Sequence, residues 1–129
     1  MLLSELKTID VYGKEWRDTI NGVSYFSSRV VLNLEHENEM VIEIPFQNGY
    51  EDQYLSESME AVKYLFPTSK WCKNNISTWE AKSRYGFIVR NTIQKGCKKK
   101  ELNHSDGYNY CTRARNPIPA RKHKQWSNC

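Results

Sequence analysis

The side chains in this sequence that could do chemistry are basic and aromatic, and they gather in its last third. Four lysines lie close together at Lys95, Lys98, Lys99 and Lys100. A second group mixes basic residues with aromatic residues: Tyr108, Tyr110, Arg113, Arg115, Arg121, Lys122, Lys124 and Trp126. Lys and Arg bind phosphates with release of counterions, and flat rings stack on unpaired bases. This composition is typical of a surface that follows a strand of nucleic acid.

Other partners also fit these basic residues. They could bind an acidic surface of another protein or a nucleoprotein, dock on the acidic first half of the same chain, or form a passive solubilising tail. Residues 1–66 carry 5 basic and 12 acidic side chains, net −7, whereas residues 67–129 carry 14 basic and 3 acidic ones, net +11. We therefore expect the two halves to face different partners. No recognition helix is visible, so sequence-specific readout is not predicted.

The histidines and cysteines of the last third raise the question of a metal site. The candidates are Cys97, His104, Cys111, His123 and Cys129. Structural zinc sites commonly use two tight ligand pairs separated by a longer loop, and no such pair occurs here. The four cysteines are expected to be thiols rather than disulfides, because the chain begins without a recognisable export signal. No cofactor is predicted.

Aromatic and amide residues of the first half could line a small ligand pocket. The candidates are Trp16, Tyr25, Gln47, Tyr50 and Tyr54. When rings and amides converge in this way, the rings can stack on a ligand and the amides can form hydrogen bonds with it. The alternative is that the rings cap the core and keep their polar ends in water.

Catalysis is not expected. The sequence has no glycine-rich phosphate loop and no nucleophile in a recognisable turn. Glu51 and Asp52 are explained by their position at the start of a predicted helix, where acidic groups interact favourably with the helix dipole.

The pattern of the chain predicts the elements that must position these residues. Asn-Gly within Ile20–Val23 separates two β-rich stretches, which predicts a hairpin over Thr8–Leu34. A third strand is expected over Met40–Ile44, ended by Pro45. Residues 50–66 have helical spacing, residues 77–86 have an N-cap serine and a final glycine, and residues 87–94 alternate as a fourth strand.

This order of elements, β-β-β-α-(α)-β, predicts an α+β fold: an antiparallel sheet of about four strands with helices on one face. Residues 1–102 would form a single domain, and residues 103–129 a basic, proline-containing C-terminal arm. No apolar stretch approaches the roughly 20 residues that span a bilayer, so we expect no membrane partner. Because no export signal is recognisable, we expect a cytoplasmic protein.

Several short motifs resemble small uncharacterised accessory proteins of tailed phages and related mobile elements. They are "YGKEW", the hairpin "NGVSYFS", "PFQNGYEDQY", Trp79 and the basic ending "CKKKEL". The resemblance runs from about Val11 to Leu102. It implies an accessory protein expressed in the cytoplasm of a host bacterium, and it implies no defined activity.

Together these features predict a non-catalytic phage-type accessory protein whose basic C-terminal half binds nucleic acid or a nucleic-acid-handling host complex. One alternative is a counter-defence inhibitor that binds a host protein directly. Another is a sponge that sequesters a small ligand such as a nucleotide.

Overall fold

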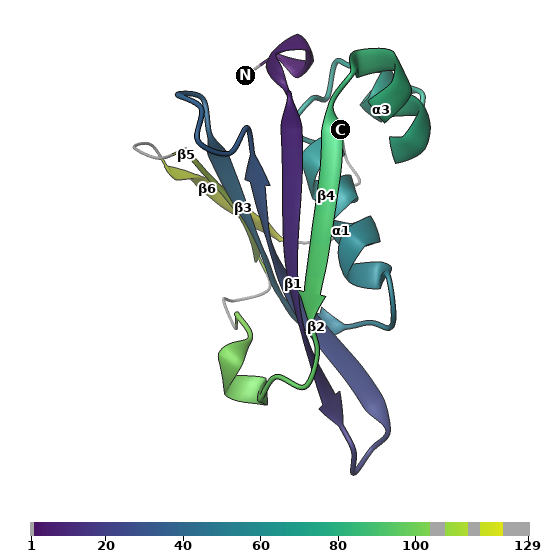
Figure 1. The fold of residues 1–129 in the computed structure, drawn as a ribbon, viewed down its shortest axis with the longest axis vertical. Helices are drawn as coiled ribbons and strands as arrows, with labels where there is room; N and C mark the ends of the chain where they lie inside the picture. Colours follow the sequence, from purple (N-terminus) through teal and green to yellow (C-terminus); the bar gives the residue numbers. More distant parts are fainter. Residues whose placement is uncertain (1, 104–107, 114–116, 123–129) are drawn as a thin grey trace.

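The computed structural model describes residues 2–103, 108–113 and 117–122, the last two segments as backbone alone. The elements follow in the order η1 Leu3–Glu5, β1 Thr8–Asp18, β2 Val23–Leu32, β3 Met40–Asn48, α1 Gln53–Lys63, α2 Lys70–Lys73, α3 Thr78–Tyr85, β4 Ile88–Gln94, η2 Lys99–Glu101, β5 Tyr108–Arg113 and β6 Pro117–Lys122. The strands form one sheet in the order β4-β1-β2-β3-β5-β6 (Figure 1). The α+β class predicted from the sequence is confirmed.

The hairpin β1–β2 is where the sequence predicts it. The two strands pair antiparallel from Ile9 opposite Leu32 to Asp18 opposite Val23. Gly22 has a φ of 67°, a left-handed conformation that glycine adopts without steric cost. At the other end the hairpin is tied down by Asn33, whose side-chain oxygen accepts from the backbone N–H of Lys7 at 2.6 Å.

Strand β3 continues beyond Pro45, where the sequence predicts that it ends. Its register against β2 shifts between Phe26 and Ser28, so that one extra residue of β3 is accommodated there. A bulge of this kind tolerates a proline, because the local ladder is already interrupted. The irregularity also frees the N–H of Phe46, which donates to the carbonyl of Asn103 at 2.6 Å.

Helix α1 packs on one face of the sheet, as expected. Its Tyr54 ring lies against Gly13, where a Cβ atom would approach the ring to 2.6 Å. Ser58 and Ser28 share a buried hydrogen bond of 2.7 Å between their hydroxyls. The glycine and the small serines therefore allow the helix to approach β1 and β2 closely.

The second predicted helix is α3, and it begins and ends as the sequence indicates. The Ser77 hydroxyl accepts from the N–H of Glu80 at 3.1 Å, and Gly86 closes the helix with a φ of 75°. The short helix α2 was not predicted. It presents Trp71, which is 1% exposed and stacks on Phe87 at 5.3 Å between ring centroids.

The fourth strand is present but runs parallel to β1, so the sheet is mixed rather than antiparallel. Thr8 pairs with Ile88 and Lys14 with Gln94. The three helices carry the chain from the end of β3 back along one face of the sheet, so β4 starts at the same end as β1. Parallel neighbours require such a crossover, and alternation within one strand does not reveal it.

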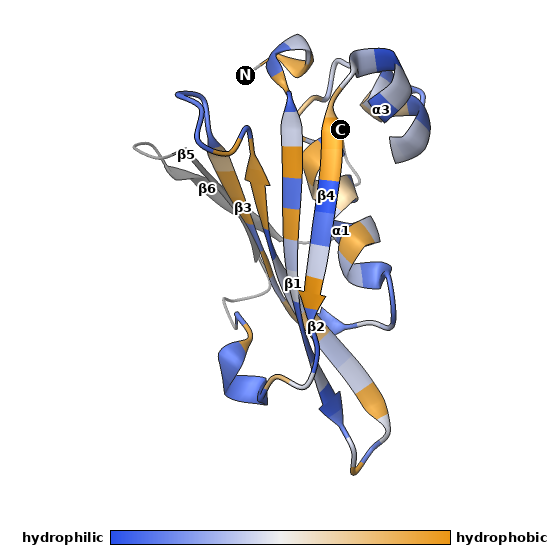
Figure 2. Ribbon diagram, in the orientation of Figure 1, coloured by the Kyte–Doolittle hydropathy of each residue, from blue (hydrophilic) through white to orange (hydrophobic). Residues whose placement is uncertain are grey.

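The core lies between the sheet and the helices. Ile9, Val11, Val30 and Ile42 are no more than 1% exposed. Figure 2 shows hydrophobic and hydrophilic residues alternating along β1, as expected for a strand with one buried face.

Residues 108–113 and 117–122 form two further strands of the sheet. Strand β5 pairs antiparallel with β3, from Met40 opposite Arg113 to Glu43 opposite Tyr110, and β6 pairs with β5. Both segments lie within the predicted C-terminal arm, residues 103–129, and they continue the sheet. Apolar periodicity does not reveal these strands, because "YNYCTR" and "PIPARK" contain few apolar residues that could alternate.

The cysteines differ from expectation at one position. Cys72, 5% exposed on α2, is disulfide-bonded, whereas Cys97 is a free, buried thiol. The other two cysteine side chains lie outside the described part of the chain. Because disulfides are rare in the cytoplasm, the sequence alone favoured thiols.

Within the residues that the structure describes, no helix combines the length and apolar character needed to cross a bilayer.

Candidate nucleic-acid interface

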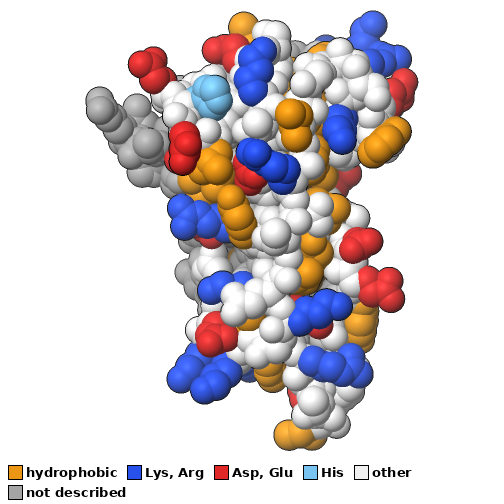
Figure 3. Space-filling view, viewed as in Figure 1, with side chains coloured by type: hydrophobic (Ala, Val, Ile, Leu, Met, Phe, Trp, Pro, Cys, Tyr) orange, Lys and Arg blue, Asp and Glu red, His pale blue; other side chains and the backbone are white. Residues whose placement is uncertain are grey.

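The face of the sheet opposite α1 is polar and carries aromatic rings. Because Val11 and Gly13 point toward the helices, their neighbours Tyr12, Lys14 and Trp16 in β1 point to the other side. We call this side the open face. Lys and Arg side chains are spread from the upper to the lower end of the surface seen in Figure 3, with Asp and Glu side chains among them.

A hollow of about 510 Å³ lies on the open face around Tyr12. Tyr12 belongs to β1, the central strand of β4-β1-β2, and is 43% exposed. Side chains and backbone from four strands and from the segment after β4 line the hollow: Tyr12, Gly13, Lys14, Ser27, Ser28, Arg29, Glu43, Thr92, Ile93, Gln94, Glu101, Leu102 and Asn103. The hollow therefore combines one accessible ring with cations, amides and hydroxyls, which are the groups that hold a nucleotide.

Both signs of charge occur in the hollow. Arg29 and Glu43 form an ion pair with 3.6 Å between Nε and Oε1. Burial raises the pKa of Glu43, and the nearby Arg29 opposes that rise. Lys14 reaches across to the carbonyl of Glu101 with its Nζ at 3.3 Å. Lys14, two residues along β1, and Arg29, opposite Tyr12 on β2, thus bring positive charge next to the Tyr12 ring.

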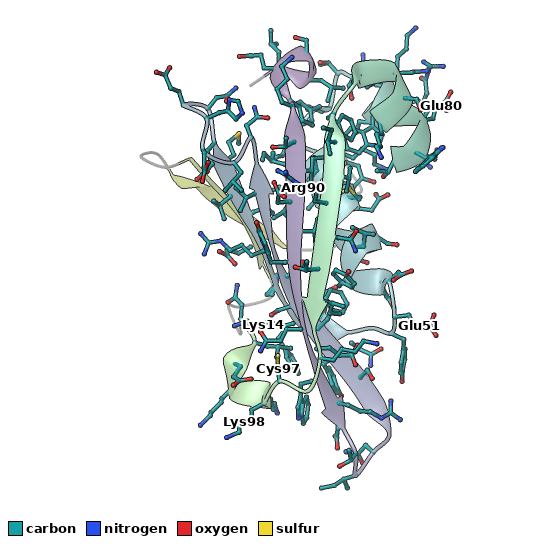
Figure 4. The ribbon with its side chains drawn as sticks, in the orientation of Figure 1. Lys14, Glu51, Glu80, Arg90, Cys97 and Lys98 are labelled. Atoms are coloured by element: carbon teal, nitrogen blue, oxygen red, sulfur yellow. The ribbon has the colours of Figure 1, made fainter. Side chains whose placement is uncertain are left out.

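A further cation, Arg90, lies beside the hollow on β4 (Figure 4). It donates from Nε and Nη2 to the two carboxylate oxygens of Asp10 at 2.7 and 2.9 Å. These hydrogen bonds and the charge of Asp10 raise the pKa of Arg90. The pair joins β4 to β1 across the open face and holds the guanidinium in a fixed position.

The chain after β4 crosses the open face before it reaches β5. We call residues 95–103 the crossing segment. The N–H of Cys97 donates to the carbonyl of Glu15 at 3.1 Å, and the N–H of Asn103 donates to the Ser27 hydroxyl at 3.1 Å. The segment is thus attached to β1 at one end and to β2 and β3 at the other.

The crossing segment places lysine on aromatic rings. Trp16, Tyr25 and Phe46 are half-buried and packed together, with 5.3 Å between the Trp16 and Tyr25 rings and 4.8 Å between Tyr25 and Phe46. The Lys99 ammonium lies 5.5 Å from the centre of the Trp16 ring, within the range of a cation–π interaction. The three rings form a surface against which Lys99 of the crossing segment packs.

The predicted nucleic-acid residues therefore divide into two groups. Lys95, Lys98, Lys99 and Lys100 are exposed, and Lys98 lies at the lower end of the view in Figure 4. The others lie where no side chain is described: Tyr108, Tyr110 and Arg113 on β5, Arg121 and Lys122 on β6, and Arg115, Lys124 and Trp126 outside the described residues.

The residues of the predicted ligand pocket are not all brought together. Trp16 and Tyr25 lie on the open face, whereas Tyr54 is 3% exposed beneath α1 and accepts from the Asn91 amide at 2.9 Å. Gln47 donates its side-chain amide to the carbonyl of Pro45 at 3.0 Å. Tyr50 is half-exposed just before α1. The sheet itself separates Tyr54 from the stacked rings.

The residues at the centre of the open face, Tyr12, Lys14 and Arg29, were not predicted as site residues from the sequence. The signal was present, because Tyr12, Lys14 and Trp16 alternate at period two in the first strand. Because side chains alternate between the two faces of a strand, this spacing places Tyr12, Lys14 and Trp16 on one side of the sheet.

Of the candidate metal ligands, Cys97 has a described side chain. Its thiol donates to the carbonyl of Gln94 at 3.4 Å. Among the residues described, no group of three or more His, Cys, Asp or Glu side chains is arranged to hold a metal ion.

Comparison of the chain with models of protein families, with curated proteins and with solved structures found no match.

Proposed function

We propose that this protein is a non-catalytic accessory protein of the phage type that binds single-stranded nucleic acid on its open face. The observation that carries the proposal is the half-exposed ring of Tyr12 in a hollow flanked by Lys14 and Arg29. A base would stack on the ring, and the two cations would contact the phosphates on either side of it.

The hollow favours a flexible single strand over a duplex. Its lining residues belong to strands and to the crossing segment, and among them no α-helix protrudes that could enter a major groove. An unpaired base can turn toward Tyr12, whereas a paired base would have to leave its stack first. Gln94 and Asn103 lie at the wall of the hollow, where amides can hydrogen-bond to a base edge.

The crossing segment extends this surface toward its lower end. Lys95, Lys98 and Lys100 are exposed there, and each could neutralise one phosphate of a strand that leaves the hollow. A nucleic-acid strand that runs from Tyr12 toward these lysines would lie on the basic side of the sheet. The acidic residues of α1 would lie on the other side. The host partner would then be a nucleic acid or a nucleoprotein in the bacterial cytoplasm.

A second candidate is an inhibitor that binds a host protein directly. The observation that favours it is the outer edge of β4 beside Trp79, which pairs with no strand in the described part of the chain. A nucleotide sponge would use the hollow alone. The three functions differ in what should bind: an oligonucleotide, a protein segment or a mononucleotide.

The test is a salt titration of binding by fluorescence anisotropy, with a labelled single-stranded oligonucleotide, its duplex and a labelled mononucleotide. We expect Tyr12→Ala to weaken single-strand binding about tenfold, since one stacked base contributes about 1–3 kcal/mol. Tyr12→Phe should retain most of the affinity, because it keeps the ring. Trp79→Ala is the matched control, since it removes another exposed ring, 75% exposed, outside the open face.

The electrostatic part is tested by replacing Lys98, Lys99 and Lys100 with glutamate in the full chain. The log–log salt slope should fall by about one for each phosphate that is no longer neutralised. A chain ending at Leu102 is unsuitable, because it would remove β5 and expose the edge of β3.

If single strands bind equally well to wild type and to Tyr12→Ala, or do not bind at low salt, the proposal is wrong. Tight binding of the mononucleotide alone would favour the sponge.

A further inference from the structure

The strand β4 is one edge of the sheet, and its outer side pairs with no strand among the residues described. On its inner side the N–H of Ile88 donates to the carbonyl of Lys7 at 2.9 Å, and the parallel ladder continues to Gln94. Backbone groups of alternate residues in a strand point to opposite sides. Val89, Asn91 and Ile93 therefore direct their N–H and C=O groups outward.

A groove of about 420 Å³ lies beside this edge. It is lined by Leu55, Ser56, Met59 and Glu60 of α1, by Thr78, Trp79 and Lys82 of α3, and by Val89 and Asn91 of β4. Trp79 is 75% exposed, whereas Met59 is buried. The groove is thus an apolar channel with a strand edge on one side and helices on the other, on the far side of the sheet from Tyr12.

The edge of β4 also lacks the features that protect edge strands from pairing. Its sequence, "IVRNTIQ", contains no proline, and its one charged residue, Arg90, is bound to Asp10 on the open face. The strand at the opposite edge of the sheet, β6, contains Pro117 and Pro119. Proline removes N–H donors and blocks an incoming strand, so the two edges differ in their capacity to pair.

The charge at the groove indicates the kind of partner. Lys82 lies over the Trp79 ring at 5.0 Å and has no ion pair among the described residues. Glu60, the acid of the groove, is already paired with Lys63 at 2.9 Å. An incoming chain with an acidic side chain next to an apolar one would pair with Lys82 and cover Trp79. A second copy of β4 brings no acid, because its sequence contains none.

We propose that the outer edge of β4 binds an extended, acidic segment of a partner protein as an additional strand of the sheet. The backbone of the segment would pair with Val89, Asn91 and Ile93. One of its apolar side chains would enter the groove beside Trp79, and an acidic side chain would contact Lys82. This site is separate from the open face and does not depend on nucleic-acid binding.

The test begins with a displayed library of random octapeptides, selected on the full-length protein and counter-selected on Trp79→Ala. We expect enriched peptides to alternate apolar and polar residues and to carry at least one acid. The best peptide is then synthesised with a fluorescent label. Trp79→Ala should raise its Kd at least about tenfold and Lys82→Glu about fivefold, effects typical of an aromatic anchor and of a contacting charge.

Two controls establish whether the peptide occupies the groove and the strand edge. Lys73→Glu removes an exposed lysine of α2 outside the groove and should change the Kd less than about twofold, as expected of surface charges that make no contact. Methylating alternate backbone nitrogens of the peptide should abolish binding in one of the two registers, since only the N–H groups that face β4 form hydrogen bonds with it.

The proposal is overturned by any of three results. The first is a library with no enrichment over the Trp79→Ala counter-selection. The second is a peptide whose affinity is unchanged by methylation in both registers. The third is a dimer, detected by sedimentation, that Trp79→Ala dissociates. Tyr12→Ala should leave peptide binding intact, so failure of the nucleic-acid proposal and failure of this one are distinguishable.

Discussion

The two faces of the sheet are built from alternating residues of the same strands, yet they differ in burial and polarity. On the helix side Ile9, Val11 and Ile42 are buried and apolar. On the open side Tyr12 is half-exposed and Arg29 is an exposed cation. Because successive side chains in a strand point to opposite faces, one position can pack in the core while its neighbour remains accessible to a ligand.

Tyr12 and Gly13 show this separation most directly, since they are adjacent in the chain. Gly13 is buried under Tyr54 of α1, whereas Tyr12 opens into the hollow. Substitutions at the two positions should therefore change different properties, which makes the comparison testable.

The largest expected difference between the faces is at Ile42 and its neighbour Glu43. Ile42→Ala removes a side chain that is 0% exposed and should lower the free energy of unfolding by about 2–5 kcal/mol through reduced burial and a cavity. Glu43→Gln should change it by less than about 1 kcal/mol, because its ion pair is partly exposed. Urea unfolding measures both, and equal losses would contradict the separation of the faces.

An intermediate effect is expected at Gly13. The methyl group of Gly13→Ala would lie 2.6 Å from the Tyr54 ring, which is buried and held by Asn91. We expect a loss of about 1–3 kcal/mol from overpacking. Tyr12→Ala should cost less than about 1 kcal/mol and reduce oligonucleotide binding instead. Thermal unfolding with the binding assay checks both, and the reverse pattern would show that Tyr12 is structural.

The smallest expected effect is a pH dependence from Glu43. Because burial raises its pKa in the folded protein, its protonated form stabilises the fold relative to its ionised form. This contribution is fully present below the ordinary glutamate pKa of 4.5 and is lost as the pH rises through the folded-state pKa. Solvent screening should limit it to about half a kcal/mol.

The measurement is the difference in unfolding free energy between wild type and Glu43→Gln, followed from neutral pH to below the ordinary pKa. Wild type should gain stability relative to the variant as the pH falls. Oligonucleotide affinity should rise over the same interval in wild type more than in the variant, because protonation removes a negative charge from the hollow. A difference that does not vary with pH would contradict the assignment.

Much of the fold could be predicted because its signals are local. The Asn-Gly turn, the Ser77 cap and the final Gly86 each act within a few residues, and all are found where they were expected. In β2 the apolar residues Phe26, Val30 and Leu32 are spaced at multiples of two, and all three are buried. These features depend on conformational preferences that are determined by a few neighbouring residues.

The candidate site was harder to predict because it is assembled from distant segments. The basic residues at 95–100 were identified by composition, but their position over Trp16 depends on hydrogen bonds between the crossing segment and β1. The ion pair between Asp10 and Arg90 likewise joins residues 80 positions apart. No local pattern indicates which distant residues meet.

The sequence by itself determined the positions of β1, β2, β4, α1 and α3 and which of their side chains alternate, since these follow from steric preferences and short-range periodicity. Tertiary structure alone decided that β4 lies parallel to β1, that β5 and β6 extend the sheet beside β3, and that the β4 edge of the described sheet lies next to Trp79. The reason is that backbone hydrogen bonds between strands are nearly independent of side-chain type. Neighbours in a sheet are therefore selected by the packing of the whole chain.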